Sequence, residues 1–427
     1  MRVVHLSHSD LDGGAARAAW RLHLGLHRRG MDSTLRVSDA RSGHWTVRGP
    51  RTTAERMGAR LRPMLGRLVA ERLVTGNPVL HSPAIAPTGW SRTLAREPAT
   101  VAHLHWVQKE FMSIADLGRL RGPAVWTLHD MWAFCGAEHY ADDDRWREGY
   151  RSDNRPPHES GFDLNRWTWQ RKRRHWQRPL QLLCPSRWLA DCVRASALMH
   201  DWPVRVIPNP IDTEFWRPAP KAQARELLGL PPDAPLLLYV AHGGSRDPRK
   251  GFAQLREALL AASARLPALE LVVCGQPEPR EPEIPGVRTR HLGIVHDDLT
   301  LRLACSAADA LVLPSLLDNL PNSGVEALAC GTPVVAFEVG GLPDIVTHLQ
   351  NGYLAPARDA SGLAAGIHWV LSDPARHAAL RAAARRHAER TFAESVVLPA
   401  LLEVYAEALA RGGSSRPTAN LPGRETE

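Results

Sequence analysis

Short β-type runs alternate with helical stretches from one end of the chain to the other, and this alternation restricts the possible folds more than any other feature. In the segment that follows the first run, Ala15, Ala19, Leu22 and Leu26 recur at helical spacing. Repeated strand–helix units form parallel sheets that are covered by helices. The sequence therefore predicts an α/β protein with doubly wound parallel sheets. Its strands are predicted at Arg2–Leu6, Thr34–Val37, Val101–His105, Ala124–Leu128, Gln181–Cys184, Val204–Ile207, Leu236–Val240, Leu271–Cys274, Ala310–Leu313 and Pro333–Ala336.

The length of 427 residues predicts two domains rather than one. Four closely spaced prolines, the first of them Pro203, mark the connection between them. Residues 1–205 and 206–390 are then two Rossmann-like domains that face each other across a ligand cleft. Residues 391–410 are predicted to form a helix that packs back across the domains. Residues 411–427, which are polar and rich in Gly and Ser, are predicted to be a disordered tail.

The positive charge is concentrated in the first half of the chain. Residues 1–200 carry 31 Lys and Arg against 19 Asp and Glu, whereas residues 201–427 carry 22 against 26. A basic front half indicates an anionic partner, which is a membrane surface, a nucleic acid or a phosphorylated substrate. No recognised nucleic-acid-binding motif accompanies the charge, so we expect no nucleic acid.

The chain has no run of eighteen apolar residues, no CxxC pair and a strand-like N-terminus, which together predict a reduced, cytoplasmic protein. Peripheral contact with the inner face of the cytoplasmic membrane stays open because Arg166–Arg178 is basic and aromatic. Trp169, Arg173 and Trp176 share one helical face there. This pattern suits either a membrane-interface patch or a helix whose tryptophans pack on the front domain. The packing interpretation is favoured.

Two segments have the composition of phosphate-binding loops. Gly14 belongs to a Gly-Gly pair between the first strand and the first helix, which suits either a phosphate or a tight turn. The stretch GGSRDPRKGF contains Lys250, one of only four lysines against 49 arginines. With Arg246 and Arg249 it forms a cationic cluster after a predicted strand, where phosphates bind in such sheets. The alternative for this cluster is a solvated basic loop.

The stretch Pro314–Val346 has the strongest pattern. A buried strand ends at Pro314, a loop carries Asp318, and a helix is predicted to open at Asn322–Gly324 with Glu326 on its first turn. The amides at the helix start suit a diphosphate, and the two carboxylates suit sugar hydroxyls. The alternative for Glu326 is that it only favours the helix N-terminus electrostatically.

Taken together, these segments resemble the retaining nucleotide-sugar glycosyltransferases of the GT-B fold, the group 1 or family 4 set. The family motif E-x7-E reads D-x7-E here, from Asp318 to Glu326, and ALACGTPVV and GGLPDIV follow it. Further likenesses occur in the family's order, and the nearest is to the bacterial branch that builds exopolysaccharide and other glycans of the cell envelope. They are GGAARAA, WTLHDMWAF around His129, PSRW, VIPNPID, RKGF, VVCGQ and DNLPN.

The resemblance implies a hexosyltransferase that acts with retention and needs neither a metal nor a cofactor. Its donor is a nucleotide-sugar, and its acceptor is a glycan or a lipid-linked molecule. Glu326 would hold the donor ribose, Asp318 the transferred sugar, and Lys250 the leaving diphosphate, while His129 would face the reacting sugar. The residues implied in donor binding are Gly14, Arg246, Arg249, Gly275, Asn322, Ser323 and Gly324. Asp318 is one methylene shorter than the family's Glu, so the donor sugar stays undefined.

Three other functions were weighed. A nucleotide-sugar epimerase or hydrolase on the same fold would use the same donor cleft. A phosphorylase would need a lysine for pyridoxal phosphate, and four lysines leave few candidates. A non-catalytic protein that binds membrane surfaces is disfavoured because Asp318, Glu326 and Lys250 are all present. A zinc site at Cys135, His139 and His158 is disfavoured because no second cysteine lies nearby.

Overall fold

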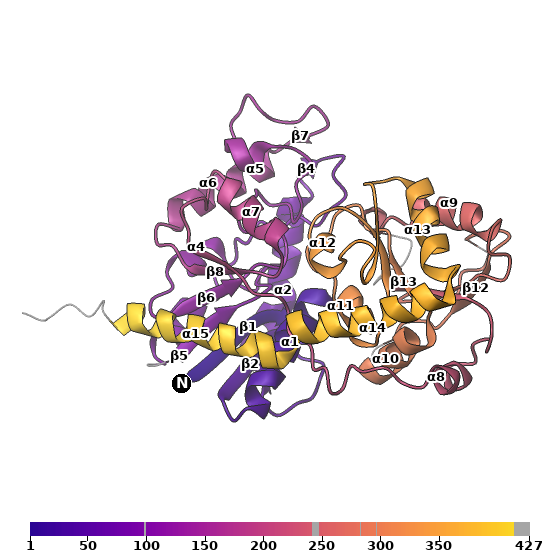
Figure 1. Ribbon diagram of the computed structural model, residues 1–427. Coiled ribbons are helices and arrows are strands. Elements are labelled where there is room, and N and C mark those ends of the chain that lie inside the picture. Colours follow the sequence, from indigo (N-terminus) through magenta and orange to yellow (C-terminus); the bar gives the residue numbers. More distant parts are fainter. Residues whose placement is uncertain (98–99, 241–246, 282, 296, 414–427) are drawn as a thin grey trace, which may run out of the picture.

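The computed structural model describes residues 1–97, 100–240, 247–281, 283–295 and 297–413. It consists of two parallel sheets that lie side by side, each with helices around it (Figure 1). The first sheet has the strand order β3-β2-β1-β5-β6-β8-β9 and the second the order β12-β11-β10-β13-β14-β15. The predicted doubly wound α/β architecture with two sheets is therefore confirmed.

The N-terminal half supplies the seven-stranded sheet and a small antiparallel pair, β4 with β7. Its strands are β1 (Arg2–Ser9), β2 (Asp32–Asp39), β3 (Val47–Arg48), β4 (Leu73–Val74), β5 (Thr100–Leu104), β6 (Ala124–Thr127), β7 (Ser160–Gly161), β8 (Gln181–Cys184) and β9 (Val204–Val206). Its helices are α1 (Gly14–Arg28), α2 (Thr53–Ala70), α3 (Trp90–Ala95), α4 (Ile114–Gly118), α5 (Arg145–Glu148), α6 (Leu164–His175) and α7 (Arg187–Ala195).

The C-terminal half supplies the six-stranded sheet and the last two helices of the described chain. Its strands are β10 (Leu236–Val240), β11 (Glu270–Cys274), β12 (Arg288–His291), β13 (Ala310–Leu313), β14 (Val334–Phe337) and β15 (Gly352–Ala355). Its helices are α8 (Lys221–Leu227), α9 (Phe252–Ser263), α10 (Asp298–Ala307), α11 (Asn322–Ala329), α12 (Leu342–Ile345), α13 (Ala360–Leu371), α14 (Pro374–Thr391) and α15 (Glu394–Gly413), with a 3-10 turn at Pro248–Lys250.

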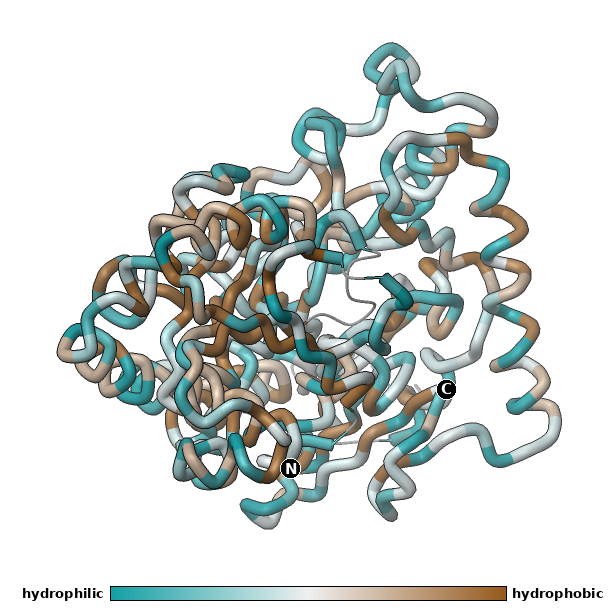
Figure 2. Tube along the Cα trace, turned by 90° about the vertical axis from the view of Figure 1, so that its right-hand side faces the viewer, coloured by the Kyte–Doolittle hydropathy of each residue, from teal (hydrophilic) through white to brown (hydrophobic). Residues whose placement is uncertain are grey.

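The central strands β10 and β13 of the second sheet are apolar throughout because both faces of that sheet are covered. In β10, Leu236 and Leu238 pack into one hydrophobic cluster, whereas Leu237 and Tyr239 pack into another on the opposite face. This alternation follows from the two-residue period of a strand. Figure 2 shows hydrophobic residues gathered in the interior and hydrophilic ones on the outer turns. Each predicted strand coincides with an observed one to within about three residues.

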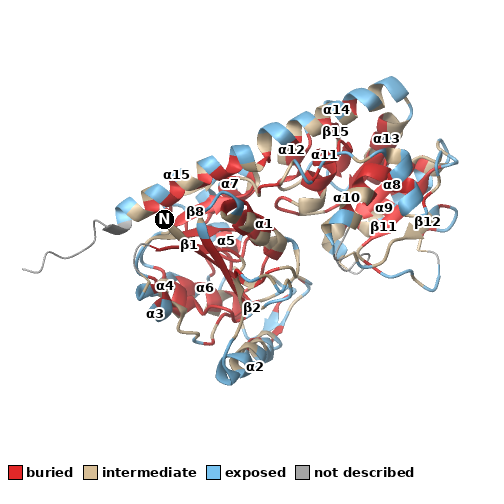
Figure 3. Cartoon of the chain, turned by 90° about the horizontal axis from the view of Figure 1, so that it is seen from below, coloured by how far each residue is buried: buried red, intermediate tan, exposed pale blue. Residues whose placement is uncertain are grey.

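The chain crosses back to its first half at the end. Figure 3 shows α14 and α15 running along one side of both domains. Helix α14 contributes Ala384 and Ala388 to a core of the second half, whereas α15 packs Val397 and Leu401 against strands of the first sheet. The last helix begins at Glu394 rather than at the predicted position 391, and it continues to Gly413 rather than to 410. Residues 414–427 of the predicted tail lie outside the described residues.

The first sheet ends one residue later than the predicted boundary at 205. Strand β9 runs over Val204–Val206 and pairs with β8, so Val206 belongs to the N-terminal sheet. None of the helices in the described ranges is both long and apolar enough to span a bilayer.

Candidate active site between the two domains

Loops that follow the carboxyl ends of strands meet between the domains. From the first sheet come Gly14 after β1 and His129 after β6. From the second come Lys250 after β10 and Asp318 after β13. Parallel sheets bind ligands at this edge, beside the point where the strand order reverses. The structure therefore brings the predicted residues from both halves to one place.

Asp318 and Lys250 form an ion pair in the second domain. Lys250 Nζ lies 2.6 Å from Asp318 Oδ2, and the carboxylate also accepts hydrogen bonds from Ser315 Oγ at 3.3 Å and from the Asn319 backbone N–H at 3.1 Å. Asp318 is buried, whereas a quarter of the Lys250 side chain is exposed. An acidic group and a cation thus stand together where a sugar and a diphosphate were expected.

Glycines allow the backbone segments around this pair to approach each other closely. Gly251 has φ 66°, and a Cβ atom there would lie 1.7 Å from the carbonyl oxygen of Pro314. A Cβ atom on Gly341 would lie 1.7 Å from the carbonyl oxygen of Asn319. Only glycine fits at either position. The RKGF and GGLPDIV stretches therefore hold Lys250 and the Asp318 loop in contact.

Asn319 joins the two domains beside the site. Its Oδ1 accepts a hydrogen bond from Ser186 Oγ at 2.6 Å, and its Nδ2 donates to the carbonyl oxygen of His129 at 3.2 Å. Asn319 is buried. The sequence analysis named the DNLPN stretch but missed this residue's role, since both of its partners lie in the other domain.

The N-termini of α1 and α11 meet between the domains. Asn322 Nδ2 donates to the carbonyl oxygen of Gly14 at 2.9 Å, and neither helix has an acidic residue in its first turn. Helix N-termini carry partial positive charge and unpaired N–H groups, so two of them together suit an anion. The Gly324 N–H already donates to the Pro321 carbonyl oxygen, which leaves the amides of Asn322 and Ser323 as the better candidates.

Glu326 is not on the first turn of α11, as the sequence analysis predicted. The helix begins at Asn322, so Glu326 is its fifth residue, and the local sequence did not fix the start of the helix to one residue. Its buried carboxylate pairs with Arg21 of α1, whose Nη1 lies 2.7 Å from Oε1. This ion pair crosses between the domains.

Arg21 belongs to a small network that sequence reasoning missed. Its Nη2 lies 3.2 Å from Asp298 Oδ1, to which Arg17 also donates at 3.1 Å, and its guanidinium lies 4.9 Å from the ring centroid of Trp216. Burial lowers the pKa of Arg21, but the carboxylates of Glu326 and Asp298 outweigh this and raise it above the ordinary value. Arg21 is therefore a permanent cation between the domains.

The remaining predicted donor residues have different environments. Arg249 pairs with Asp247 at 2.8 Å, and its guanidinium lies 4.7 Å from the ring centroid of Tyr140 in the other domain. Arg249 and Lys250 form the described part of the cationic cluster. Gly275 follows β11 with φ 110°, and its N–H donates to the carbonyl oxygen of Gly293. Arg246 lies outside the described residues.

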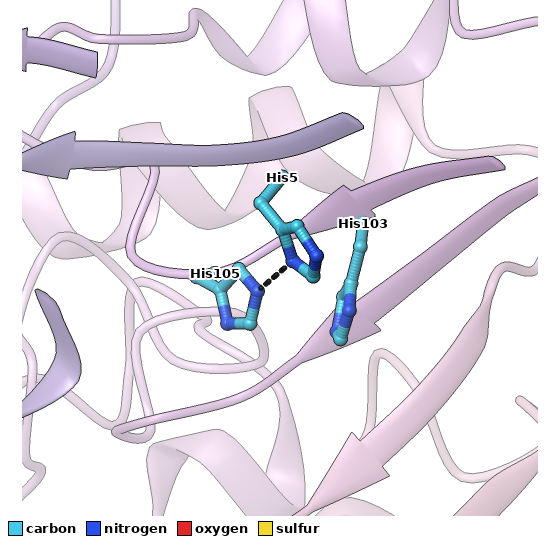
Figure 4. A group of neighbouring side chains, drawn as sticks. All are labelled: His5, His103 and His105. Atoms are coloured by element: carbon cyan, nitrogen blue, oxygen red, sulfur yellow. Dashed lines mark hydrogen bonds between the residues drawn. The ribbon is translucent and has the colours of Figure 1, made fainter. Parts of the chain in front are cut away.

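His129 is the outermost member of a row of histidines. Its Nε2 lies 3.3 Å from His105 Nδ1, and His105 Nε2 lies 3.0 Å from His5 Nδ1 (Figure 4). Burial lowers the pKa of His129 to about 4, although Asp130 opposes the shift. The ring is therefore neutral near pH 7, with one nitrogen that can donate and one that can accept a hydrogen bond.

The nitrogens of His5, His103 and His105 lie within 4.8 Å of one another, which is the spacing of a metal site. Their hydrogen bonds argue against a metal. His103 already contacts Tyr405 Oη at 2.6 Å and Thr127 Oγ1 at 2.7 Å, and both His105 nitrogens are used in the row. His103 and His105 would each have to release a protein partner to bind a metal, whereas His5 Nε2 has no hydrogen-bond partner among the described residues. That the enzyme needs no metal stays a prediction.

The basic and aromatic stretch Arg166–Arg178 lies mostly against the first domain. Trp169 and Trp176 are buried in its core, which is the favoured packing interpretation. Lys172 is also buried and donates to the carbonyl oxygens of Trp132, Cys135 and Gly136. A membrane patch built on these tryptophans is therefore wrong, because they are not accessible.

Two family models match the chain in succession. Glycosyltransferase Family 4 matches residues 12–215, and Glycosyl transferases group 1 matches residues 234–373. The enzyme class predicted from the sequence, a glycosyltransferase, is the one that both models name. Nothing in these matches tests the retaining mechanism or the exopolysaccharide branch.

Curated relatives include D-inositol 3-phosphate glycosyltransferases. The protein from Thermobispora bispora is 38% identical over 232 residues, which are 50% of this chain and 53% of that protein. The protein from Mycolicibacterium smegmatis is 33% identical over 236 residues, which are 52% of each chain. The chain thus spans about half the length of the curated relatives it matches.

Two solved structures have the same overall fold. Sucrose-phosphate synthase from Thermosynechococcus elongatus superposes with a TM-score of 0.66 at 19% identity, over 96% of this chain and 100% of that one. Anabaena HepE in complex with UDP-glucose superposes with a TM-score of 0.64 at 18% identity, over 95% and 100%. These likenesses confirm the predicted GT-B fold.

Proposed function

The chain carries a Glycosyltransferase Family 4 domain and a Glycosyl transferases group 1 domain on a GT-B fold, and from this premise we propose that it transfers a sugar from a nucleotide-sugar to an acceptor in the cleft between its domains. The second domain binds the soluble donor, and the basic first domain binds the acceptor. Transfer occurs with retention of the anomeric configuration.

The observation that carries this proposal is the arrangement of charge at the cleft. The N-termini of α1 and α11, without an acidic first turn, meet between the domains, and Asn322 at the start of α11 follows Asp318, the partner of Lys250, by four residues. Cleavage of a nucleotide-sugar places negative charge on the departing diphosphate and positive charge on the sugar ring. The helix N-termini and the cationic cluster stabilise the first charge, and the carboxylate of Asp318 accepts hydrogen bonds from the sugar.

Glu326 binds the donor ribose while it keeps its contact with Arg21. A carboxylate offers about four positions that can accept hydrogen bonds, and Arg21 Nη1 occupies one of them on Oε1 of Glu326. Arg21 holds this carboxylate charged and in place, so that two ribose hydroxyls can donate to it. The neutral ring of His129 meets the reacting sugar from the first domain.

Two acceptor classes have separate support. The likeness of the motifs to the exopolysaccharide branch supports a glycan or lipid-linked acceptor in cell-envelope polysaccharide synthesis. The names of the relatives support a small phosphorylated polyol such as D-inositol 3-phosphate instead. Both are anionic or held at an anionic surface, which suits the excess of 31 basic over 19 acidic residues in residues 1–200.

The first experiment screens UDP-, GDP- and dTDP-sugars with each acceptor class and measures nucleotide release and product formation. Asp318→Asn and Lys250→Ala are expected to lose about 2–4 kcal/mol of transition-state stabilisation, or ~30- to 1000-fold in kcat/KM. Glu257→Gln, an exposed carboxylate on α9, is the matched control. Full turnover in folded Asp318→Asn and Lys250→Ala variants would refute the assignment.

The same assay separates the other functions. A donor isomer without nucleotide release would indicate an epimerase, and free sugar with every acceptor tested would indicate a hydrolase. The anomeric configuration of the product, read from its NMR coupling constant, tests retention.

A further inference from the structure

Helix α2 directs an apolar face away from the protein. Its large apolar side chains recur at spacings of four, three, one and three residues, so they lie on one face of an 18-residue helix. Each is between 49% and 62% exposed, whereas an amphipathic helix of a soluble domain normally buries this face. We call this surface the α2 face, and it consists of Met57, Leu61, Met64, Leu65 and Leu68.

The opposite side of α2 explains why the α2 face does not point toward the protein. Gly66 is the one buried residue of the helix, and a Cβ atom there would lie 2.7 Å from Glu110. Glu110 is itself fixed, since it accepts hydrogen bonds from the backbone N–H groups of Ile85 and Ala86. The helix therefore contacts the domain closely at Gly66, where a larger residue would collide with Glu110, and Val69 and Ala70 pack on the domain near its C-terminal end. If the helix were rotated to bring one of its leucines to the contact at Gly66, the leucine side chain would collide with Glu110.

The N-terminus of α2 is fixed as well. Thr52 Oγ1 accepts a hydrogen bond from the Glu55 N–H at 3.2 Å, and Glu55 Oε2 accepts one from the Thr52 N–H at 3.1 Å. This capping box sets where the helix starts and hence the direction of every side chain along it. The capped start and the close approach of Gly66 to Glu110 together set the outward direction of the apolar residues.

Arginines line one border of the α2 face. Arg56, Arg60 and Arg67 are exposed and lie four and then seven residues apart, which places them in a row along the helix beside the apolar residues. Arg67 also pairs with Glu71 at 2.7 Å. Figure 3 shows α2 protruding from the first domain on the side away from α15, with most of its length exposed.

We propose that α2 docks on an anionic lipid bilayer, with the α2 face among the headgroups and the arginine row on the lipid phosphates. A helix with apolar residues on one face and a basic border lies in the plane of a membrane interface. Residues 1–200 carry 31 basic and 19 acidic side chains. This excess of positive charge adds long-range attraction to such a surface. In an antiparallel pair of α2 helices, the arginine rows of the two copies would lie on the same side and repel each other, so a second copy in that arrangement fits less well.

The test uses the full chain and two kinds of vesicle, phosphatidylcholine alone and phosphatidylcholine with about one third phosphatidylglycerol. Co-sedimentation at low salt is expected with the anionic vesicles and not with the neutral ones. The double variant Leu61→Glu and Leu68→Glu is expected to bind at least ~10-fold more weakly. Its matched control is Leu260→Glu, because Leu260 is an exposed leucine of α9 in the other domain.

A second pair of variants locates the charge. Neutralising Arg56 and Arg60 together is expected to weaken vesicle binding and its dependence on salt, whereas neutralising Arg173 and Arg174 of α6 is expected to change neither. Wild-type protein that ignores anionic vesicles, or Leu61→Glu and Leu68→Glu protein that binds them like wild type, would overturn the proposal. The proposal would also be overturned if sedimentation velocity showed a wild-type dimer that the double variant does not form. A second copy would then cover the α2 face. The proposed sugar transfer does not depend on these results, because donor turnover is measured without vesicles.

Discussion

Replacing Arg21 by methionine is expected to destabilise the protein more than replacing its partner Glu326 by glutamine. The two side chains are 10% and 5% exposed, and they face each other across the domain interface at 2.7 Å. Arg21→Met removes the cation and leaves a buried carboxylate without a counter-charge. Breaking a buried ion pair in this way costs about 3–5 kcal/mol.

The opposite change costs less because of the third member of the network. In Glu326→Gln, Arg21 keeps its contact with Asp298 at 3.2 Å, and Asp298 is 35% exposed, so the cation stays partly compensated and partly solvated. The expected loss is about 1–2 kcal/mol, that of a weakened charge-assisted hydrogen bond. The double variant has neither charge, and it should be more stable than the sum of the single losses implies by about 1–3 kcal/mol.

Denaturant titrations of the wild type, the two single variants and the double variant at one pH measure these terms. The midpoint of the transition is read from tryptophan fluorescence, and the wild-type slope checks that the unfolding mechanism is unchanged. Two results would refute the reasoning. One is a Glu326→Gln loss as large as the Arg21→Met loss, and the other is strict additivity in the double variant.

The other predictions concern the metal, the pH and one glycine. Turnover is expected to survive EDTA because the cationic cluster stands in the place of a divalent cation, and a loss that Mg²⁺ reverses would contradict this. Stability is expected to fall as the pH drops from 7 to 5: burial lowers the pKa of His103 to about 3 and of His129 to about 4, so the folded chain keeps these rings neutral while the unfolded chain protonates them below pH 6.5. The loss, about 1–2 kcal/mol per ring, is measured by denaturant titration, and a flat profile in that window would disprove it. Gly251→Ala is expected to lower donor turnover, since its Cβ would lie 1.7 Å from the Pro314 carbonyl oxygen, whereas Gly229→Ala, at φ 63° with no atom within 4 Å, carries the backbone strain alone. If Gly251→Ala and Gly229→Ala lowered donor turnover equally, crowding against the Pro314 carbonyl oxygen would not be the cause.

The local sequence determined the strands and the loops that carry the site. Continuous apolar runs such as Leu236–Val240 have one stable environment, the middle of a parallel sheet, so their positions were predictable. Short and partly polar edge strands such as β12 and β15 lack that signal and were missed. The motifs that contain Lys250, Asp318 and Glu326 were found for a related reason, since they directly follow or precede buried strands.

Only the tertiary structure decided which of these side chains meet and which face solvent. The partners of Glu326 and Asn319 lie in the other domain, and no local spacing encodes a contact that depends on how two sheets pack. An apolar period like that of α2 normally belongs to a buried face, yet Gly66 and its neighbour Glu110 direct that face outward. The basic surroundings of Trp169 left both membrane exposure and packing open, with packing favoured, and only the structure places the ring in the core. A sequence fixes the period of a helix, whereas the shape of the surface against which it packs fixes the direction.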